Sequence, residues 1–367
     1  CKQHGFQEPG FLAIVSAVDP LQFIRNQVLG HFPDWEDAAV APLGKGLINQ
    51  TFLLTADSGR AVLQCMAPIF SPVINENIAA VTSALAAAGL PTPRLLQTRD
   101  GRLWLDLDDK NGVWRLQTFV PGTSFDKVQS PAQAHNAGAL VARFHRALEG
   151  LAHDFRGLRE GVHDTAQHLA RLREALSVHK DHRLMARVEP VAEAILARAR
   201  ELEPLPALAP RLCHGDLKLN NILFAGNEPP GSEQALCLID FDTVGPMPLA
   251  YELGDAWRSW CNVSGEDDTV ARINMAVFRT SFAGYAAGIG RDLSEAERRA
   301  LLLGVEWISL ELASRFAADA LFESYFGWNA KRFPSRGEHN LVRGRGQLAL
   351  HEAFVATRGE RAAILGL

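Results

Sequence analysis

The chain has 367 residues, 47% of them hydrophobic and 22% charged, which is the composition of an ordinary globular protein. Its formal net charge is −5, so no basic excess points to a nucleic acid or an anionic membrane as a partner. The length predicts two lobes rather than one minimal core. The five scattered cysteines form no C-x-x-C pair, which argues against a disulfide framework or a zinc site and favours a cytoplasmic location.

The N-terminal third reads as mainly β-structure. Pro20 opens a short amphipathic helix in which Leu21, Ile24 and Val28 share one face. A longer helix over 75–88 is ended by Gly89 and Pro91. A five-stranded antiparallel sheet is predicted from short β-like runs at 38–43, 51–55, 61–66, 103–105 and 113–120.

The pair Pro121-Gly122 interrupts this pattern, and the rest of the chain is mainly helical. Helices are predicted at 132–148, 165–178, 184–202, 250–261, 269–287, 294–320 and 340–356. Three short apolar strands are predicted at 211–213, 222–224 and 235–239. We therefore predict an α+β fold with a β-sheet N-lobe (1–120) and a helical C-lobe (121–367).

The strongest chemical pattern is HGDLKLNN over 214–221, between two of these strands, followed by LIDFD over 238–242. Phosphoryl transfer needs a group that positions a hydroxyl, oxygen ligands for Mg²⁺ and positive charge on the phosphates. Asp216 can take the hydroxyl proton, and Lys218 can offset charge in the transition state. Asn221 and Asp240 offer the hard oxygen ligands that Mg²⁺ requires.

Each part of this pattern also has an ordinary explanation. A single Asp before a turn usually caps the turn. Likewise, Gly44-Lys45-Gly46 at the first turn of the β-rich lobe could be a hairpin, or could let backbone amides approach phosphates. It is no Walker A loop, because the G-x-x-x-x-G-K-[ST] pattern is absent. The combined spacing of His, Asp, Lys and Asn before a second strand that ends in carboxylates is what favours catalysis.

This combination resembles the aminoglycoside phosphotransferase and choline kinase superfamily, which shares its fold with the protein kinases. The resemblance implies a protein-kinase-like two-lobe fold, ATP as donor and Mg²⁺ as metal. Gly215 stands where protein kinases have Arg, Asp240-Phe241-Asp242 replaces D-F-G, and no A-P-E follows. A protein substrate is therefore disfavoured, and a small-molecule acceptor is expected.

The same resemblance implies a nucleotide site in the N-lobe, formed by Gly44, Lys45, Gly46, Asn49, Thr51, Gln64, Gln117 and Phe119. Kinases place a Lys on the third strand, whereas this chain has Gln64, which can donate a hydrogen bond but carries no charge. Either Lys45, Lys218 or another cation compensates, or nucleotide is held more weakly. The substitution also keeps a catalytically inactive binding protein open as an alternative.

A closer resemblance is to the N-acetylhexosamine 1-kinases, which phosphorylate the C1 hydroxyl of N-acetylglucosamine or N-acetylgalactosamine. It runs from about residue 40 to 355 and rests on GLINQTF (46–52), VLQCM (62–66), KLNNIL (218–223), IDFDT (239–243), RFAAD (315–319) and EHNLVR (338–343). Gln on the third strand and Lys after the catalytic Asp belong to that group too. The chain departs from it at Leu47, where the relatives have His, and this puts the particular sugar in doubt.

Carried over by position, this resemblance makes Asp216 the base at the sugar hydroxyl, with Leu47, Arg315, His339 and Arg343 as further sugar contacts. A structural ion pair is an equal explanation for Arg315, and a structural hydrogen-bond network is one for His339 and Arg343. Three aromatic residues could stack on a sugar: Trp257, Tyr325 and Trp328. Buried rings are more often part of the core.

Other small acceptors remain open, among them choline, homoserine, other sugars and aminoglycosides. An aminoglycoside is a polycation and needs an acidic cleft, for which the sequence offers Glu252, Asp255, Asp267 and Asp268. The expected partners are thus ATP and a small sugar, with no nucleic acid and no membrane. We expect a monomer or a weak dimer.

Overall fold

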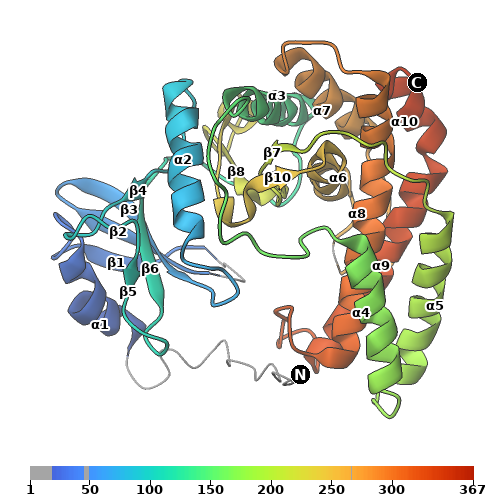
Figure 1. The fold of residues 1–367 in the computed structure, drawn as a ribbon, viewed down its shortest axis with the longest axis horizontal. Coiled ribbons are helices and arrows are strands. Elements are labelled where there is room, and N and C mark those ends of the chain that lie inside the picture. The colour runs from blue at the N-terminus through green and yellow to red at the C-terminus, as the bar shows by residue number, and fades with distance from the viewer. Residues whose placement is uncertain (1–18, 45–48, 266) are drawn as a thin grey trace. The chain divides into compact units, whose positions relative to one another are not determined.

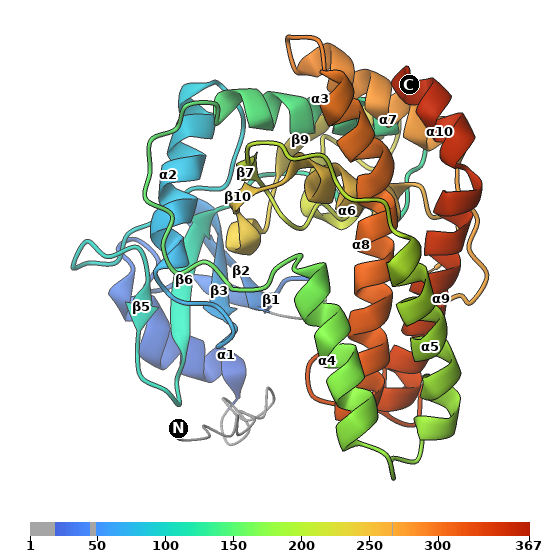
Figure 2. The same cartoon turned by 45° about the vertical axis from the view of Figure 1, so that its right-hand side comes forward.

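The computed structural model describes residues 19–44, 49–265 and 267–367, and the chain divides into two compact units (Figures 1 and 2). The first unit holds the described residues up to Ser83 together with Pro93–Val120 and Asp154–Leu158. The second unit holds Ala84–Thr92, Pro121–His153 and Arg159–Leu367. A β-sheet unit and a mainly helical unit confirm the predicted fold class.

The first unit is built on an antiparallel sheet of six strands in the order β1-β2-β3-β6-β4, with β5 also paired to β6. Its strands are β1 (Ala39–Pro42), β2 (Gln50–Ala56), β3 (Gly59–Met66), β4 (Leu95–Leu96), β5 (Leu105–Asp106) and β6 (Val113–Thr118). The sheet has one strand more than predicted. The strand that was not predicted is β4, which has only two residues. A segment that short has no alternation that sequence reasoning could detect.

One face of this sheet is apolar, as the alternation along the strands requires. Leu54, Leu63 and Leu116 are fully buried in it, on β2, β3 and β6. Helix α1 (Pro20–Phe23) and the π-helical turn that continues it to Val28 bury Ile24 and Val28 in the same cluster. The opposite face of the sheet carries both apolar and polar residues, among them Thr51, Gln64 and Arg115.

Helix α2 (Ile74–Ala87) follows β3 and ends where the sequence indicates. Gly89 has a φ of 74° and the N–H of Leu90 donates to the carbonyl of Leu85, which closes the last turn. A residue with a Cβ is strained in this left-handed conformation, so Gly89 is the residue that ends the helix.

The second unit consists mainly of helices α3 (Pro131–Ala147), α4 (Thr165–Val178), α5 (Met185–Glu201), α6 (Leu249–Trp260), α7 (Met275–Gly288), α8 (Glu295–Phe322), α9 (Arg336–Ala356) and α10 (Arg358–Leu365). The predicted start of α7 at residue 269 is wrong, because Asn274 caps the helix by accepting from the N–H groups of Ala276 and Val277. Helix α10 was not predicted. Figures 1 and 2 show α4, α5, α8 and α9 running alongside one another.

Glycines let two pairs of these helices cross with their backbones in contact. A Cβ on Gly304 of α8 would lie 2.0 Å from the carbonyl oxygen of Ala250 on α6. A Cβ on Gly284 of α7 would lie 1.9 Å from the carbonyl oxygen of His135 on α3. Any larger residue would push these helices apart, so α6 and α3 are held in fixed positions behind the candidate site.

Short strands lie between α5 and α6 and frame the predicted catalytic segments. Strand β7 (Arg211–Cys213) pairs with β10 (Gly245–Met247), and β8 (Ile222–Phe224) pairs with β9 (Ala235–Leu238). Strand β10 was not predicted, because it contains Pro246, which cannot donate to a ladder. Among the described residues, no helix combines the length and the apolar character needed to cross a membrane.

The first turn of α8 carries a buried acidic residue whose ionisation stabilises the fold. Glu297 accepts from the N–H of Ser294 at 2.8 Å and from Nη1 of Arg291 at 2.9 Å. The hydrogen bonds from Arg291 are the main cause of a pKa lowered from 4.5 to about 2. A lowered pKa means that this stabilisation is complete above about pH 4.5 and is lost as the pH falls towards 2.

We therefore expect Glu297→Gln to lower the free energy of unfolding by about 1 kcal/mol at neutral pH and to have little effect near pH 2. Denaturant unfolding of both chains between pH 7 and pH 2 measures the difference. Glu295→Gln, in the same turn but exposed, is the matched control. A deficit that does not shrink as the pH falls would contradict this role for Glu297.

Candidate active site

The loop between β7 and β8 brings together three of the residues predicted for catalysis. Nζ of Lys218 lies 3.0 Å from Oδ2 of Asp216. Nδ2 of Asn221 donates to the backbone carbonyl of Asp216 at 2.8 Å and to its Oδ2 at 3.1 Å. The carboxylate of Asp216 is thus held in one orientation and remains partly exposed.

The fourth residue, Asp240, follows β9 in a left-handed conformation with a φ of 69°. A non-glycine residue in this region is strained, and such strain clusters at functional sites. Partial burial would lower the pKa of Lys218, but the carboxylates of Asp216 and Asp240 outweigh it and raise the pKa. Asp240 therefore lies close enough for its charge to raise the pKa of Lys218. Lys218 stays protonated at neutral pH.

His214 and Gly215 give the loop its shape. Nε2 of His214 donates to the carbonyl of Ile239 at 2.9 Å, and its Nδ1 accepts from the N–H of Asp216 at 3.3 Å. Gly215 has a φ of 80°, and a Cβ there would lie 2.8 Å from the carbonyl oxygen of Thr243. This close approach explains why Gly stands where protein kinases have Arg.

A buried carboxylate on α6, that of Glu252, holds the backbone of the same loop. Oε1 of Glu252 accepts from the N–H of His214 at 2.8 Å, and Oε2 accepts from the N–H of Gly215 at 2.9 Å. Burial would raise the pKa of Glu252, but its hydrogen bonds with His145 and His214 outweigh that effect and lower it. Glu252 is therefore ionised, and it fixes the two residues that precede Asp216.

The contacts of Glu252 continue through buried side chains. Nε2 of His145, on α3, lies 3.3 Å from Oε1 of Glu252. Burial lowers the pKa of His145, so the neutral ring donates to Glu252 through Nε2 and accepts from the hydroxyl of Tyr285 at 2.9 Å through Nδ1. Arg211 in turn donates to that hydroxyl at 3.1 Å. In this series of hydrogen bonds from Arg211 to Glu252, each donor therefore has an acceptor.

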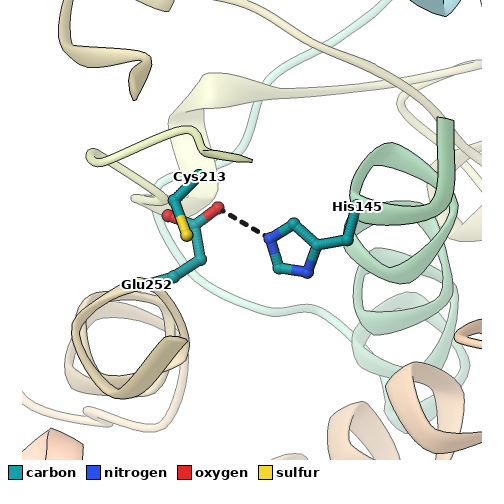
Figure 3. Close-up of side chains that lie close together, drawn as sticks. All are labelled: His145, Cys213 and Glu252. Atoms are coloured by element: carbon teal, nitrogen blue, oxygen red, sulfur yellow. Dashed lines mark hydrogen bonds and ion pairs between the residues drawn. The ribbon is translucent and has the colours of Figure 1, made fainter. Parts of the chain in front are cut away.

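His145, Cys213 and Glu252 also have the composition of a metal site, and Figure 3 shows them side by side. Both oxygens of Glu252 and both ring nitrogens of His145 are already hydrogen-bonded. Burial raises the pKa of the Cys213 thiol, whereas a metal ligand must be a thiolate. We therefore interpret this cluster as a support for the catalytic loop.

Helix α6 contacts the loop at two more points. Oγ of Ser259 accepts from the N–H of Leu219 at 3.3 Å, and Nε1 of Trp260 donates to the carbonyl of Leu217 at 2.8 Å. Sequence reasoning missed this supporting role of α6. One signal was available, because Glu252 lies among the apolar positions Leu249 and Leu253 on the face of the helix that is expected to be buried.

A second group that sequence reasoning missed links the loop to α8. Nε2 of His163 lies 3.4 Å from the carbonyl oxygen of Gly215, and its Nδ1 lies 3.2 Å from Oε1 of Glu311. Burial would lower the pKa of His163, but its hydrogen bond to Glu311 outweighs this and raises it. No local pattern identifies His163, because its partners are far away in the sequence.

Arg315 lies one turn beyond Glu311 on α8. Its Nη1 is 3.9 Å from Oε1 of Glu311, and its guanidinium lies 5.8 Å and 5.5 Å from the ring centres of Tyr325 and Phe326. The segment that carries these rings is held by Asp319, which accepts from the N–H groups of residues 324, 325 and 326. The predicted sugar contact is thus connected to the catalytic loop through Glu311 and His163.

His339 and Arg343 support neighbouring segments. Nε2 of His339 lies 2.7 Å from Oδ1 of Asp267, and its Nδ1 accepts from the N–H of Asn329 at 3.2 Å. Nη1 of Arg343 donates to the carbonyl of Gly327 at 2.8 Å. These contacts fit a supporting network, and direct contact with a sugar stays a prediction for both residues.

Of the aromatic candidates, Trp257 belongs to the core. It is 1% exposed, and its ring centre lies 4.4 Å from that of Phe278. It is therefore not available to stack on a sugar.

The predicted nucleotide residues that the structure describes all belong to the first unit. Lys45 and Gly46, and the predicted sugar contact Leu47, lie outside the described residues, whereas Gly44 has a φ of 75°. Oδ1 of Asn49 accepts from the N–H of Ala67 at 2.9 Å. The guanidinium of Arg60 lies 4.1 Å from the ring centre of Phe119.

Gln64 connects three neighbouring strands. Its Nε2 donates to Oγ1 of Thr51 at 3.3 Å. Its Oε1 accepts from Nε2 of Gln117 at 3.0 Å and from Nε of Arg115 at 2.9 Å. Arg115 was not among the predicted site residues.

A kinase-like fold, an antiparallel sheet unit with a helical unit, and a loop that groups Asp216, Lys218 and Asn221 define the class of a small-molecule phosphotransferase. The chain belongs to the phosphotransferase enzyme family APH, which it matches over residues 39–295. This confirms the predicted superfamily and implies ATP as the phosphoryl donor.

Two curated relatives that match most of this chain are named homoserine kinases. That of Methylocella silvestris is 26% identical over 301 residues, which cover 78% of this chain and 81% of the relative. That of Pseudomonas aeruginosa is 26% identical over 313 residues, which cover 81% and 85%.

Solved structures show the same fold at lower identity. A microcompartment-associated aminopropanol kinase superposes with a TM-score of 0.63 at 20% identity and covers 92% of this chain and 98% of its own. A spectinomycin phosphotransferase superposes with a TM-score of 0.57 at 14% identity and covers 92% and 99%. At such identities the likeness shows the fold alone.

Proposed function

We propose that this chain is an ATP- and Mg²⁺-dependent kinase that phosphorylates the C1 hydroxyl of an N-acetylhexosamine. The observation that carries the proposal is the group of Arg315, Glu311 and two aromatic rings on and beside α8, linked to the catalytic loop by His163. A guanidinium that a buried carboxylate holds in place, with ring faces beside it, is suited to the hydroxyls, the acetamide and the apolar face of a neutral sugar.

The charges near the loop support a neutral acceptor over an aminoglycoside. Each of the acidic residues that could form an acidic cleft has a donor of its own. Glu252 accepts from the catalytic loop, Asp255 lies 2.6 Å from Arg258, Asp267 lies 2.7 Å from Arg332, and Asp268 accepts from the N–H of Gly265. Arginines offset the charges of Asp255 and Asp267, and Glu252 is buried, so little free negative charge is left to bind a polycation.

The geometry of the loop suits phosphoryl transfer by a positioned base. In the proposed step, Asp216 takes the proton of the C1 hydroxyl while the sugar oxygen bonds to the γ-phosphorus and the bond to the β-phosphate oxygen breaks, releasing ADP. Lys218 remains protonated and offsets the negative charge that develops on the phosphoryl oxygens. Lys218 also holds the carboxylate of Asp216 in place.

The residues proposed as metal ligands fit Mg²⁺. Because Nδ2 of Asn221 donates to Asp216, the amide oxygen is the atom that remains for a cation. Asp240 adds a carboxylate, and both ligand atoms are hard oxygens. When bound, Mg²⁺ would neutralise phosphate charge and orient the γ-phosphate.

Homoserine is a second candidate acceptor, supported by the curated relatives named homoserine kinase. Homoserine carries an ammonium and a carboxylate group, so its site would need one unpaired group of each sign.

A catalytically inactive binding protein is disfavoured, because Asp216, Lys218 and Asn221 are all present and interact with one another. The proposal includes a cytoplasmic location, as the scattered cysteines predict, and a monomeric or weakly dimeric state.

An acceptor panel tests the proposal. We expect ADP release with ATP, Mg²⁺ and N-acetylglucosamine or N-acetylgalactosamine, together with an acid-labile sugar 1-phosphate detected by mass spectrometry. Homoserine, choline and kanamycin are measured in parallel. The sugar assignment fails if one of these acceptors has a kcat/KM about 10-fold or more above both sugars, and the kinase assignment fails if no acceptor is phosphorylated.

A further inference from the structure

The sheet of the first unit carries a buried cation directly beside the strand position where kinases usually have Lys. Gln64 on β3 and Arg115 on β6 are register partners, and Thr51 on β2 is the partner of Gln64 on the other side. The three side chains therefore form one row across three strands, on the face of the sheet opposite the apolar cluster. Arg115 is 1% exposed.

This row sets the orientation of the Gln64 amide. Arginine can only donate hydrogen bonds, so the atom of Gln64 that faces Nε of Arg115 at 2.9 Å must be the carbonyl oxygen. Gln117 donates to the same oxygen at 3.0 Å. The amide NH₂ of Gln64 is consequently directed towards Thr51, and it offers donors rather than an acceptor on that side.

Arg115 is itself held on a second side. Its Nη1 lies 3.4 Å from Oδ1 of Asn75 in the first turn of α2. A guanidinium stays protonated at all physiological pH values, and in a buried site its charge acts on neighbouring groups through a low effective dielectric. The positive charge that β3 lacks is therefore present one strand away, about 5 Å across the sheet.

We propose that Arg115 supplies the positive charge that the strand lysine usually supplies, and that this charge favours binding of the nucleotide's phosphates. Gln64, which Arg115 orients, acts beside it as a neutral hydrogen-bond donor. The inference rests on ATP being the donor in the proposed function. Arg115 is a positioning residue, because it acts through Gln64 and through its charge.

The test measures nucleotide binding without any acceptor, by isothermal titration of the full chain with ATP and Mg²⁺, and with adenosine. Arg115→Met is expected to weaken ATP binding about 10-fold or more and to leave adenosine binding unchanged, because adenosine has no phosphate. Arg102→Met removes one charge from an exposed arginine of the same unit and is expected to bind both ligands like the unaltered chain.

The decisive variant moves the charge back to β3. The double variant Gln64→Lys with Arg115→Met is expected to recover ATP binding to within about 3-fold of the unaltered chain. Thermal unfolding monitors the fold of each variant, and the double variant serves as the test if Arg115→Met alone does not fold.

The role of Arg115 would be overturned by unchanged ATP binding in Arg115→Met, or by a folded double variant that binds ATP about 10-fold or more weakly than the unaltered chain. An equal loss of ATP and adenosine binding would also overturn it, since it would show a purely structural role. Failure of the unaltered chain to bind ATP would instead contradict the donor in the proposed function.

Discussion

Asp216→Asn is expected to lower kcat by about 10³-fold, because an amide cannot accept the proton of the acceptor hydroxyl. The fold should be retained, since the amide oxygen of Asn can still accept from Lys218 and Asn221, which contact Oδ2 of Asp216 at 3.0 and 3.1 Å. The measurement is ADP release with the best acceptor of the panel, at saturating ATP.

Asp181→Asn, an exposed residue between α4 and α5, is the matched control and should keep full activity. Binding of ATP to Asp216→Asn should stay within a few-fold of the unaltered chain, because Asp216 contacts the acceptor rather than the donor in the proposed step. Near-normal turnover in Asp216→Asn would remove this residue from its assigned role.

The second large effect is expected at Glu252, which never touches a substrate in the proposed mechanism. In Glu252→Gln only one oxygen remains to accept from the N–H groups of His214 and Gly215, and the new NH₂ faces one of these donors. We expect the free energy of unfolding to fall by about 3 kcal/mol and kcat to fall by about 10²-fold. The KM for ATP should change little.

Glu306 provides the matched control for Glu252. It is fully buried and contacts Arg358 and Arg361, so Glu306→Gln also loses a buried, paired carboxylate. Glu306→Gln should lower stability to a similar extent and leave kcat unchanged, because its partners lie at α10 rather than at the catalytic loop. Equal kcat values for the two variants would show that Glu252 only stabilises the fold.

Most elements were predictable from local patterns. The predicted helix over 165–178 coincides with α4, and the catalytic loop lies between two strands as expected. The errors arose where local signals are weak. Strand β4 has two residues, β10 contains a proline, and α7 starts at the cap Asn274 rather than at residue 269. In each case a tertiary contact or a cap decided the boundary.

The surroundings of Asp216 were predictable only in part. Lys218 and Asn221 follow Asp216 within five residues, so chain geometry alone brings them close. Glu252 and His163 are far from the loop in the sequence, and their roles depend on how α6 and α8 pack behind it. Sequence reasoning treated Glu252 as part of an acidic cleft for a cation, and the structure corrects this, because both of its oxygens accept from the loop backbone.

By itself, the sequence determined the fold class, the family and the loop that carries Asp216, because those depend on residues close together in the chain. The sequence alone does not show which cation replaces the strand lysine. It leaves Lys45, Lys218 and other cations as possibilities. The tertiary structure identified Arg115 as a candidate, 51 residues away from Gln64. Strand pairing places the two side by side, and sheet register depends on the whole sheet rather than on any local pattern.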